Sequence, residues 1–225
     1  MSATLEDLKN FYSAQGNNTS SIFDVWERGD ARGDSVTPST YSGEYRSLML
    51  ETLVKALSAH DSKKLLSLGC GNAMIEAELA SQGYDILAVD AMPEAVELAR
   101  KKGLTSLRAD VESWAPEAGA WPVVYADGLL GHLYDSATES LPVLGRIRSW
   151  FTGGGTLVVS NDSPRSGGAV EAAPGVDAFY WLSGEYLVEQ AYAAGFSYAT
   201  CETFTYARPI SGERHRAVLI AQVHE

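Results

Sequence analysis

Cysteine is scarce in this sequence, with only Cys70 and Cys201 among 225 residues. Both lie in contexts typical of strand ends or interiors, and no cluster of Cys and His residues has the spacing of a zinc site. A disulfide framework and a structural metal are therefore not expected. With 225 residues, 45% of them hydrophobic, the chain is long and apolar enough to form one domain with a substantial core.

Positive charge is also sparse. The 17 Lys and Arg residues stand against 29 Asp and Glu residues, which gives a formal net charge of −12. A chain with this charge is repelled by phosphate backbones and by anionic lipid surfaces. We therefore expect neither nucleic acid nor membranes among its partners.

Long apolar runs are missing as well. The first residues, MSATLEDLKNFYSAQ, show no basic region followed by an apolar stretch. No later run approaches the ~20 apolar residues that span a bilayer. We expect a soluble, unsecreted and cytoplasmic protein.

Two helical patterns near the N-terminus are separated by a loose segment. Residues 29–42 are rich in Gly, Ser, Thr and Asp around Pro38, which predicts a flexible turn. Apolar residues recur at helical spacing on both sides of it, up to about His60. They are Leu5, Leu8, Phe11 and Tyr12 before the turn, and Tyr45, Leu48, Met49, Thr52 and Leu53 after it. We expect residues 1–60 to form a helical lid or arm packed on a core domain of residues 61–225.

From Lys63 onward, short apolar runs alternate with helical segments. The segments read KLLSLG, MIEAELASQG, DILAVD, PEAVELARKKG and LTSLRAD. Such alternation is typical of parallel β-α-β units. Two further strands, WPVVYAD and GTLVVSND, lie on either side of a helix from about Leu141 to Trp150. Right-handed crossovers would place all five strands in one sheet with helices on both faces.

The last third of the chain distinguishes between variants of this fold. A helix from Ser183 to Ala194 is followed by the strands FSYATCETFTYA and HRAVLIAQV, which only residues 208–214 connect. A parallel crossover needs a longer connection, so these two strands should form an antiparallel hairpin. The predicted fold is α/β, a doubly wound, seven-stranded and mostly parallel sheet with a C-terminal antiparallel hairpin.

A glycine motif follows the first strand of this sheet. The sequence LLSLGCGNAMIEAEL places Gly69 and Gly71 in a tight strand-to-helix turn, where a ligand can approach the backbone closely. Asp90 ends the second strand, at a distance from the glycines where an acidic side chain can accept hydrogen bonds from a ribose diol. Both features also have an explanation without a ligand. The glycines could serve only a tight turn that needs positive φ angles, and Asp90 could be the N-cap of the next helix.

These features together resemble the class I S-adenosylmethionine-dependent methyltransferases of the small-molecule type, over roughly Lys63 to Val223. The resemblance implies a Rossmann-like methyltransferase fold and S-adenosylmethionine as the cofactor. It implies that the glycine turn faces the methionine part of the cofactor, that Asp90 binds the ribose, that Asp110 lies near the adenine amino group, and that Asp127 to His132 lie under the sulfur. The cofactor-binding residues implied are Gly69, Cys70, Gly71, Asp90, Ala91, Met92, Asp110, Val111 and Asp127.

Two residues depart from the family pattern. Ser67 stands where an acidic residue is common in such proteins, and Ala73 stands where a third glycine is common. Ser67 removes the carboxylate that would contact the cofactor's ammonium group at that position. Ala73 is still small enough for close packing of helix on strand.

His132 is the candidate catalytic residue, because an imidazole with a pKa of ~6.5 can take a proton from a hydroxyl or an amine near neutral pH. The alternative is that His132 only packs below the cofactor and bonds to the backbone. His60, His215 and His224 lie at element ends and are expected at the surface.

Aromatic side chains gather outside the cofactor motifs and predict an acceptor site at the carboxyl edge of the sheet. We expect Tyr41 and Tyr45 to share one face at the start of the second helix, with Arg46 beside them as an anion contact. Tyr180 and Trp181 would approach from the segment after the fifth strand.

The predicted function is methyl transfer to an O, N or C atom of a soluble small molecule, in which orientation and desolvation carry most of the catalysis. An alternative is a protein of the same fold that binds the cofactor but acts as a cyclase or a binding module. An NAD-dependent oxidoreductase is a third hypothesis, which the final hairpin and the lack of a G-x-G-x-x-G motif disfavour. The sequence indicates neither the acceptor nor the oligomeric state.

Overall fold

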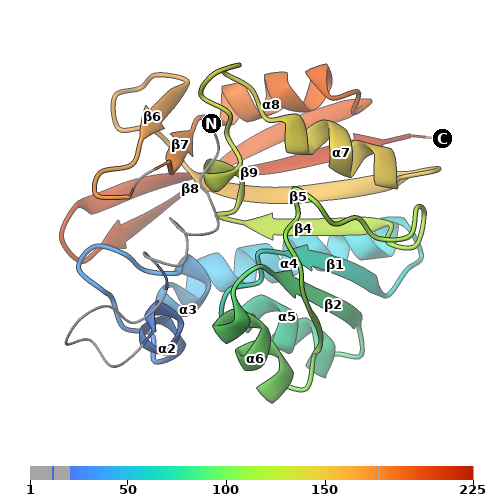
Figure 1. Ribbon diagram of the computed structural model, residues 1–225, viewed down its shortest axis with the longest axis horizontal. Coiled ribbons are helices and arrows are strands. Elements are labelled where there is room, and N and C mark those ends of the chain that lie inside the picture. The colour runs from blue at the N-terminus through green and yellow to red at the C-terminus, as the bar shows by residue number, and fades with distance from the viewer. Residues whose placement is uncertain (1–11, 13–20, 177, 225) are drawn as a thin grey trace.

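Seven strands form the central sheet of the computed structural model, which describes Tyr12, residues 21–176 and residues 178–224. These strands are β1 (Lys64–Leu68), β2 (Asp85–Asp90), β3 (Thr105–Arg108), β4 (Val123–Asp127), β5 (Gly155–Asp162), β8 (Tyr198–Arg208) and β9 (Gly212–Val223). Their order in the sheet is β3-β2-β1-β4-β5-β9-β8 (Figure 1). The first five run parallel, whereas β9 is antiparallel to both β5 and β8. The predicted fold is confirmed.

The connection in the C-terminal hairpin is shorter than the sequence pattern predicted, because β9 already begins at Gly212. Only residues 209–211 connect β8 to β9, and Arg208 pairs with Gly212 at the closed end. A connection this short allows only an antiparallel neighbour. Since β9 lies between β5 and β8, the hairpin extends the parallel sheet at its β5 edge.

Helices cover both faces of the sheet (Figure 1). One face packs against α4 (Gly43–Ala59), α5 (Met74–Ser81) and α6 (Pro93–Lys101), and the other against α7 (Pro142–Trp150) and α8 (Gly184–Ala193). Short elements complete the described chain. They are α2 (Ile22–Glu27), α3 (Pro38–Tyr41), the 3₁₀ helix η1 (Leu130–His132), and the small hairpin of β6 (Val170–Ala172) and β7 (Tyr180–Leu182).

The segment before α4 differs from the predicted flexible turn. Arg32 and Ser35 form an antiparallel bridge, and the Asp34 carboxylate accepts hydrogen bonds from the backbone N–H groups of Ile210 and Ser211. The indole of Trp26 donates to the carbonyl of Ser35 at 3.3 Å. Asp34 therefore fastens this segment to the C-terminal hairpin. The helix predicted around Leu5, Leu8 and Phe11 lies outside the described residues.

The prediction that Tyr41 and Tyr45 share one helical face is wrong. The short helix α3 ends at Tyr41, and Ser42 has the extended angles φ −121° and ψ 114°. The Ser42 hydroxyl then accepts a hydrogen bond from the Tyr45 N–H and caps a new helix, α4. Because a serine N-cap needs non-helical backbone, the two tyrosines belong to different elements.

No helix among the described residues is long and apolar enough to cross a bilayer.

Candidate active site

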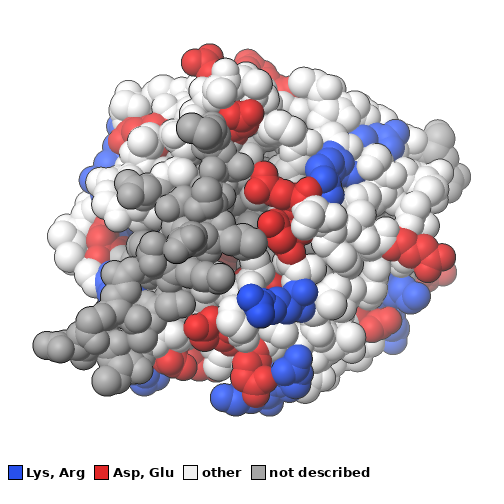
Figure 2. All heavy atoms as spheres, in the orientation of Figure 1, with Lys and Arg blue, Asp and Glu red and all other residues white. Residues whose placement is uncertain are grey.

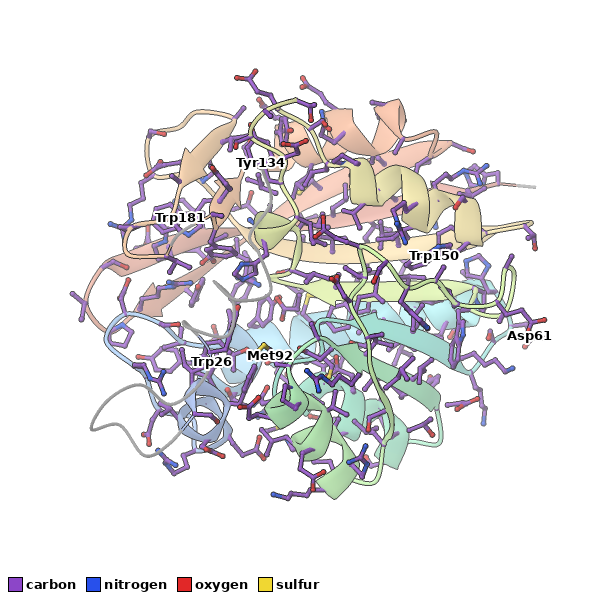
Figure 3. All side chains as sticks on the ribbon, in the orientation of Figure 1. Trp26, Asp61, Met92, Tyr134, Trp150 and Trp181 are labelled. Atoms are coloured by element: carbon purple, nitrogen blue, oxygen red, sulfur yellow. The ribbon has the colours of Figure 1, made fainter. Side chains whose placement is uncertain are left out.

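A cavity of about 740 Å³ opens at the carboxyl ends of the parallel strands. In open α/β sheets, ligands bind at this edge where the strand order reverses, which here is between β1 and β4. The walls come from the turn after β1, the ends of β2, β4, β5, β8 and β9, the segment from α2 to α3, and the β6–β7 hairpin. Trp26 of α2 and Trp181 of β7 line it from different sides (Figure 3).

The turn after β1 holds the two glycines of the predicted cofactor motif. Gly69 and Gly71 have φ angles of +64° and +54°, which glycine adopts without strain. A Cβ atom at Gly69 would lie 3.0 Å from Cδ1 of Leu129, whereas a Cβ atom at Gly71 would meet nothing closer than Cε1 of Phe23 at 4.0 Å. Both glycines and Cys70 line the cavity. The turn thus leaves room at Gly71 for a ligand that passes close to the backbone.

Asp90 lies at the end of β2, where its carboxylate ties two turns together. One oxygen accepts a hydrogen bond from the Gly71 N–H at 3.0 Å, and the other accepts from the Met92 N–H at 2.8 Å. Burial raises the pKa of Asp90 to about 6, so the side chain is ionised at pH 7. Each oxygen keeps a lone pair for a further donor. Asp90, Ala91 and Met92 all line the cavity.

The other predicted cofactor residues also line the cavity, but their side chains have different partners. Asp110 accepts a hydrogen bond from the backbone N–H of Glu112 at 2.9 Å, and Val111 beside it is buried. Asp127 accepts hydrogen bonds from Arg216, from the Ser160 hydroxyl at 3.2 Å and from the Tyr125 hydroxyl at 3.2 Å. Asp127 is thus part of an ion-pair network at the cavity wall.

His132 lines the cavity from η1 and is almost fully buried. Its Nε2 atom shares a hydrogen bond of 2.7 Å with the Tyr12 hydroxyl, and its Nδ1 atom has no partner among the described residues. Burial lowers the pKa of His132 to about 3, so the ring is neutral at pH 7. A neutral ring can accept the Tyr12 proton in this bond. Proton abstraction by Nε2 would require that the Tyr12 hydroxyl move away.

Four of the five predicted acceptor residues lie outside the walls of this cavity, and only Trp181 is part of them. Tyr41 is 39% exposed, and Arg46 pairs with Glu78 at 3.6 Å on the surface of α4 and α5. Tyr180 packs its ring against Tyr134. These contacts use the side chains elsewhere in the fold.

Tyr45 lies one layer beneath the cavity wall. It is fully buried, its hydroxyl is 2.6 Å from Oγ of Ser160, and it accepts a hydrogen bond from Arg216. The expectation that Tyr45 faces a substrate is therefore not supported, since its hydroxyl supports Arg216 instead. The reason is that α4 packs its buried face onto the sheet.

Glu76 is a cavity residue that the sequence analysis missed. It is 3% exposed, and its Oε1 atom accepts a hydrogen bond of 2.5 Å from the Ser67 hydroxyl. Burial raises its pKa to about 7, and no salt bridge to a cation is found for it among the described residues. Ser67, which replaces the common strand acid, thus holds a carboxylate from α5 in the same region. In the sequence, Glu76 stands directly beside Ile75 within an apolar pattern, which is the only signal of its burial.

Comparison with known proteins agrees with this geometry. The family described as "Methyltransferase domain" matches residues 41–200. The chain belongs to this family. The methyltransferase is also 40% identical over 232 residues to a protein called "Tabtoxin biosynthesis enzyme" from Pseudomonas amygdali pv. tabaci, a match that covers 99% of this chain and 91% of the relative.

Solved structures with the same fold include one methyltransferase with bound S-adenosylmethionine and one with S-adenosylhomocysteine, the demethylated product. Magnesium protoporphyrin IX methyltransferase from Synechocystis PCC 6803, with bound S-adenosylmethionine, is 19% identical with a TM-score of 0.60 and covers 97% of this chain and 99% of its own. Burkholderia thailandensis 1,6-didemethyltoxoflavin-N1-methyltransferase, with S-adenosylhomocysteine, is 19% identical with a TM-score of 0.57 and covers 87% of this chain and 94% of its own.

S-adenosylmethionine is the cofactor of this methyltransferase, and the residues present fit it. Gly71 leaves a backbone cradle that a Cβ atom would fill, and Asp90 offers a buried carboxylate for hydroxyl donors. Glu76 is a second buried carboxylate, and S-adenosylmethionine brings positive charge. When bound, the cofactor supplies an electrophilic methyl group on a positively charged sulfur.

Proposed function

We propose that this methyltransferase transfers the methyl group to an O, N or C atom of a small molecule bound in the same cavity. The observation that carries the proposal is that one cavity of about 740 Å³ joins the glycine turn and Asp90 to a wall of aromatic side chains. Small-molecule sites are clefts of roughly 300–1,000 Å³ with mostly apolar walls. This size suits a cofactor and a small acceptor together.

Aromatic rings enclose the acceptor end of the cavity. Tyr12 stacks on Phe23 with 5.3 Å between ring centroids, and His132 lies 4.3 Å from Phe179 by the same measure. Trp181 lines the wall from β7. Walls of this kind exclude water from the transferred methyl group and fix the acceptor in line with it, which are the main contributions to a displacement reaction.

The proposed roles of the site residues follow from their positions. The backbone at Gly69, Cys70 and Gly71 holds the methionine part of the cofactor, and Asp90 with Ala91 and Met92 binds the ribose. Asp110 and Val111 bind the adenine. Glu76 accepts the cofactor's ammonium group in place of the missing strand acid. His132 stays a candidate catalytic residue, and in the observed geometry it positions the Tyr12 hydroxyl at the acceptor end.

The names of related proteins support a small-molecule acceptor. The Burkholderia enzyme was solved with 1,6-didemethyltoxoflavin, and the Synechocystis enzyme is named for magnesium protoporphyrin IX. The relative that matches almost the whole chain is named for tabtoxin biosynthesis.

The experiment is a turnover assay that measures S-adenosylhomocysteine in the presence of S-adenosylmethionine and panels of small amines, phenols and carboxylates. We expect turnover with at least one panel and a product heavier by one methylene. Tight binding of S-adenosylhomocysteine without turnover on any panel would instead favour a cofactor-binding module.

A further inference from the structure

Two arginines of the C-terminal hairpin form part of the cavity wall beyond the cofactor residues. Arg208 comes from the end of β8 and Arg216 from β9, and both line the cavity. Their side chains are 13% and 5% exposed. Asp162, at the carboxyl end of β5, lies between them. Together these three residues form a charged wall at the end of the cavity where Phe179 and Trp181 also line it.

The network around Asp162 holds both guanidinium groups rigidly. Arg208 donates to one Asp162 oxygen, and Nη1 of Arg216 donates to the other at 3.0 Å. Nε of Arg208 donates to the Tyr206 hydroxyl at 2.8 Å, and Nε of Arg216 donates to the Ser160 hydroxyl at 2.5 Å. A guanidinium fixed in this way needs little further ordering before it binds a ligand.

Both arginines retain unused donors. Nη1 of Arg208 donates to the carbonyl of Asp34, and Nη2 of Arg216 donates to Asp127. Each terminal nitrogen of the two side chains carries a second N–H group. No acceptor for these second groups is found among the described residues. A planar oxyanion is the ligand that a fixed guanidinium recognises best.

Buried positive charge exceeds buried negative charge in this part of the fold. Arg214 is 3% exposed, its guanidinium carbon lies 4.0 Å from the centre of the Trp181 ring, and it has no salt bridge within the described part of the chain. Three arginines that are at most 13% exposed thus stand against two carboxylates that are at most 15% exposed, Asp127 and Asp162. The local excess is opposite in sign to the net charge of −12 of the whole chain.

The acidic side chains at this end are already paired, which disfavours a cationic acceptor. Asp127 and Asp162 accept from the arginines, and Oδ1 of Asp34 accepts from the N–H groups of Ile210 and Ser211. Aromatic rings alone could attract a cation. A cation here would nevertheless lie near buried arginines without an unpaired carboxylate to offset them.

We propose that the methyl acceptor carries a carboxylate, which the unused N–H groups of Arg208 and Arg216 bind. The inference rests on the proposed function, because it places the acceptor in the same cavity. It adds that the acceptor is an anionic metabolite, although the charge of the whole chain would favour a neutral or cationic one. The carboxylate anchors the acceptor, and the aromatic walls orient the rest of it toward the methyl group.

Calorimetric titration of malonate into the complex with S-adenosylhomocysteine tests this proposal. Malonate is a small dicarboxylate, and dimethyl malonate is its uncharged counterpart. Arg208→Gln removes one guanidinium and leaves Asp162 paired with Arg216. Arg165→Gln is the matched control, because the Arg165 guanidinium lies over the same Trp181 ring at 5.1 Å but does not line the cavity.

We expect malonate to bind and dimethyl malonate not to bind. Arg208→Gln should weaken malonate binding by roughly tenfold to a hundredfold, the effect of a lost charged hydrogen bond, and Arg165→Gln should leave it unchanged. Circular dichroism and the titration of S-adenosylhomocysteine verify that each variant is folded and binds cofactor. They also separate failure of this proposal from failure of the proposed function.

Three results would overturn the proposal. The first is no malonate binding to a complex that binds S-adenosylhomocysteine normally. The second is an equal weakening of malonate binding in Arg208→Gln and Arg165→Gln, which would indicate a general electrostatic attraction of the anion and no specific contact with Arg208. The third is binding of tetramethylammonium in place of malonate, which would assign the aromatic walls to a cationic acceptor.

Discussion

Asp90 connects the glycine turn to the start of α6 through its two carboxylate oxygens, which accept from Gly71 and Met92. Replacing it with alanine removes these bonds and the proposed acceptor for the ribose hydroxyls. We expect Asp90→Ala to weaken S-adenosylhomocysteine binding by about 1.5–3 kcal/mol, measured by isothermal titration. An unchanged affinity in a variant that circular dichroism shows to be folded would contradict the assigned role.

His132 should affect the pH dependence of stability. Burial lowers its pKa to about 3, so the unfolded chain binds a proton at this residue between about pH 6.5 and pH 3 and the folded chain does not. The stability that the neutral ring contributes is therefore complete above pH 6.5 and is lost as the pH falls toward 3. Between pH 7.5 and pH 5 we expect the wild type to lose about 2 kcal/mol more than His132→Gln.

Urea unfolding at the two pH values measures this difference. Glutamine keeps a hydrogen-bond acceptor for the Tyr12 hydroxyl but does not titrate, so the comparison isolates the imidazole. If wild type and variant lose the same free energy, His132 takes up its proton in the folded protein as it does in water.

Single site residues could be predicted where the motif that identifies them lies within one short segment of the sequence. Gly69, Gly71 and Asp90 belong to one strand-turn-helix-strand segment, where spacing alone places them at one edge of the sheet. Arg216 and Asp162 come from strands far apart in the sequence, and their pairing depends on sheet register. Tyr45 was assigned to the wrong surroundings because helical spacing does not say which side of a helix packs on the sheet.

At the level of elements, the contact between η1 and the β6–β7 hairpin shapes the acceptor end of the cavity. A Cβ atom added at Gly131 would clash with the Tyr180 carbonyl oxygen and with the Phe179 ring. We expect Gly131→Ala to push the hairpin away from His132 and to reduce methyl transfer at least tenfold, a barrier change of about 1.4 kcal/mol, while S-adenosylhomocysteine still binds.

The control for this prediction is Gly145→Ala on α7, where an added Cβ atom meets nothing within 4 Å. It should keep its activity and gain slight helix stability. Loss of cofactor binding in Gly131→Ala would show that the hairpin supports the whole cavity and not the acceptor end alone.

The elements that could be predicted are those with a long periodic pattern or a strict geometric limit. The five parallel strands were found from their alternation with helices, and the final hairpin from its short connection. The β6–β7 hairpin escaped prediction because each strand has three residues, too few for a period to be read. The helix break at Ser42 was missed because its N-cap role competes with a continuous helical pattern.

For the whole molecule, cofactor binding should raise the melting temperature. A ligand present at a hundred times its dissociation constant stabilises the folded state by about 2.7 kcal/mol, which corresponds to roughly 5–10 °C for a chain of this size. Differential scanning fluorimetry with S-adenosylhomocysteine measures the shift. Gly71→Val is the matched negative control, since valine would fill the space beside the backbone where the cofactor lies and would strain the turn. A full shift in this variant would place the cofactor elsewhere.

The surface is in keeping with the scarcity of positive charge in the sequence. Figure 2 shows acidic and basic side chains interspersed over the described part of one face. The local excess of buried arginine near Asp162 lies inside the fold, where the formal charge of the chain gives no hint of it.

The position of β9 has a consequence for synthesis. Every residue of β5 is buried, and β9 pairs with the whole length of β5, from Gly155 with Val223 to Asp162 with Arg216. Yet β9 follows every other described strand in the chain. Until β9 leaves the ribosome, β5 presents an open and apolar edge to other nascent chains. A stop codon within β9 would therefore lead to aggregation rather than to a slightly shorter enzyme.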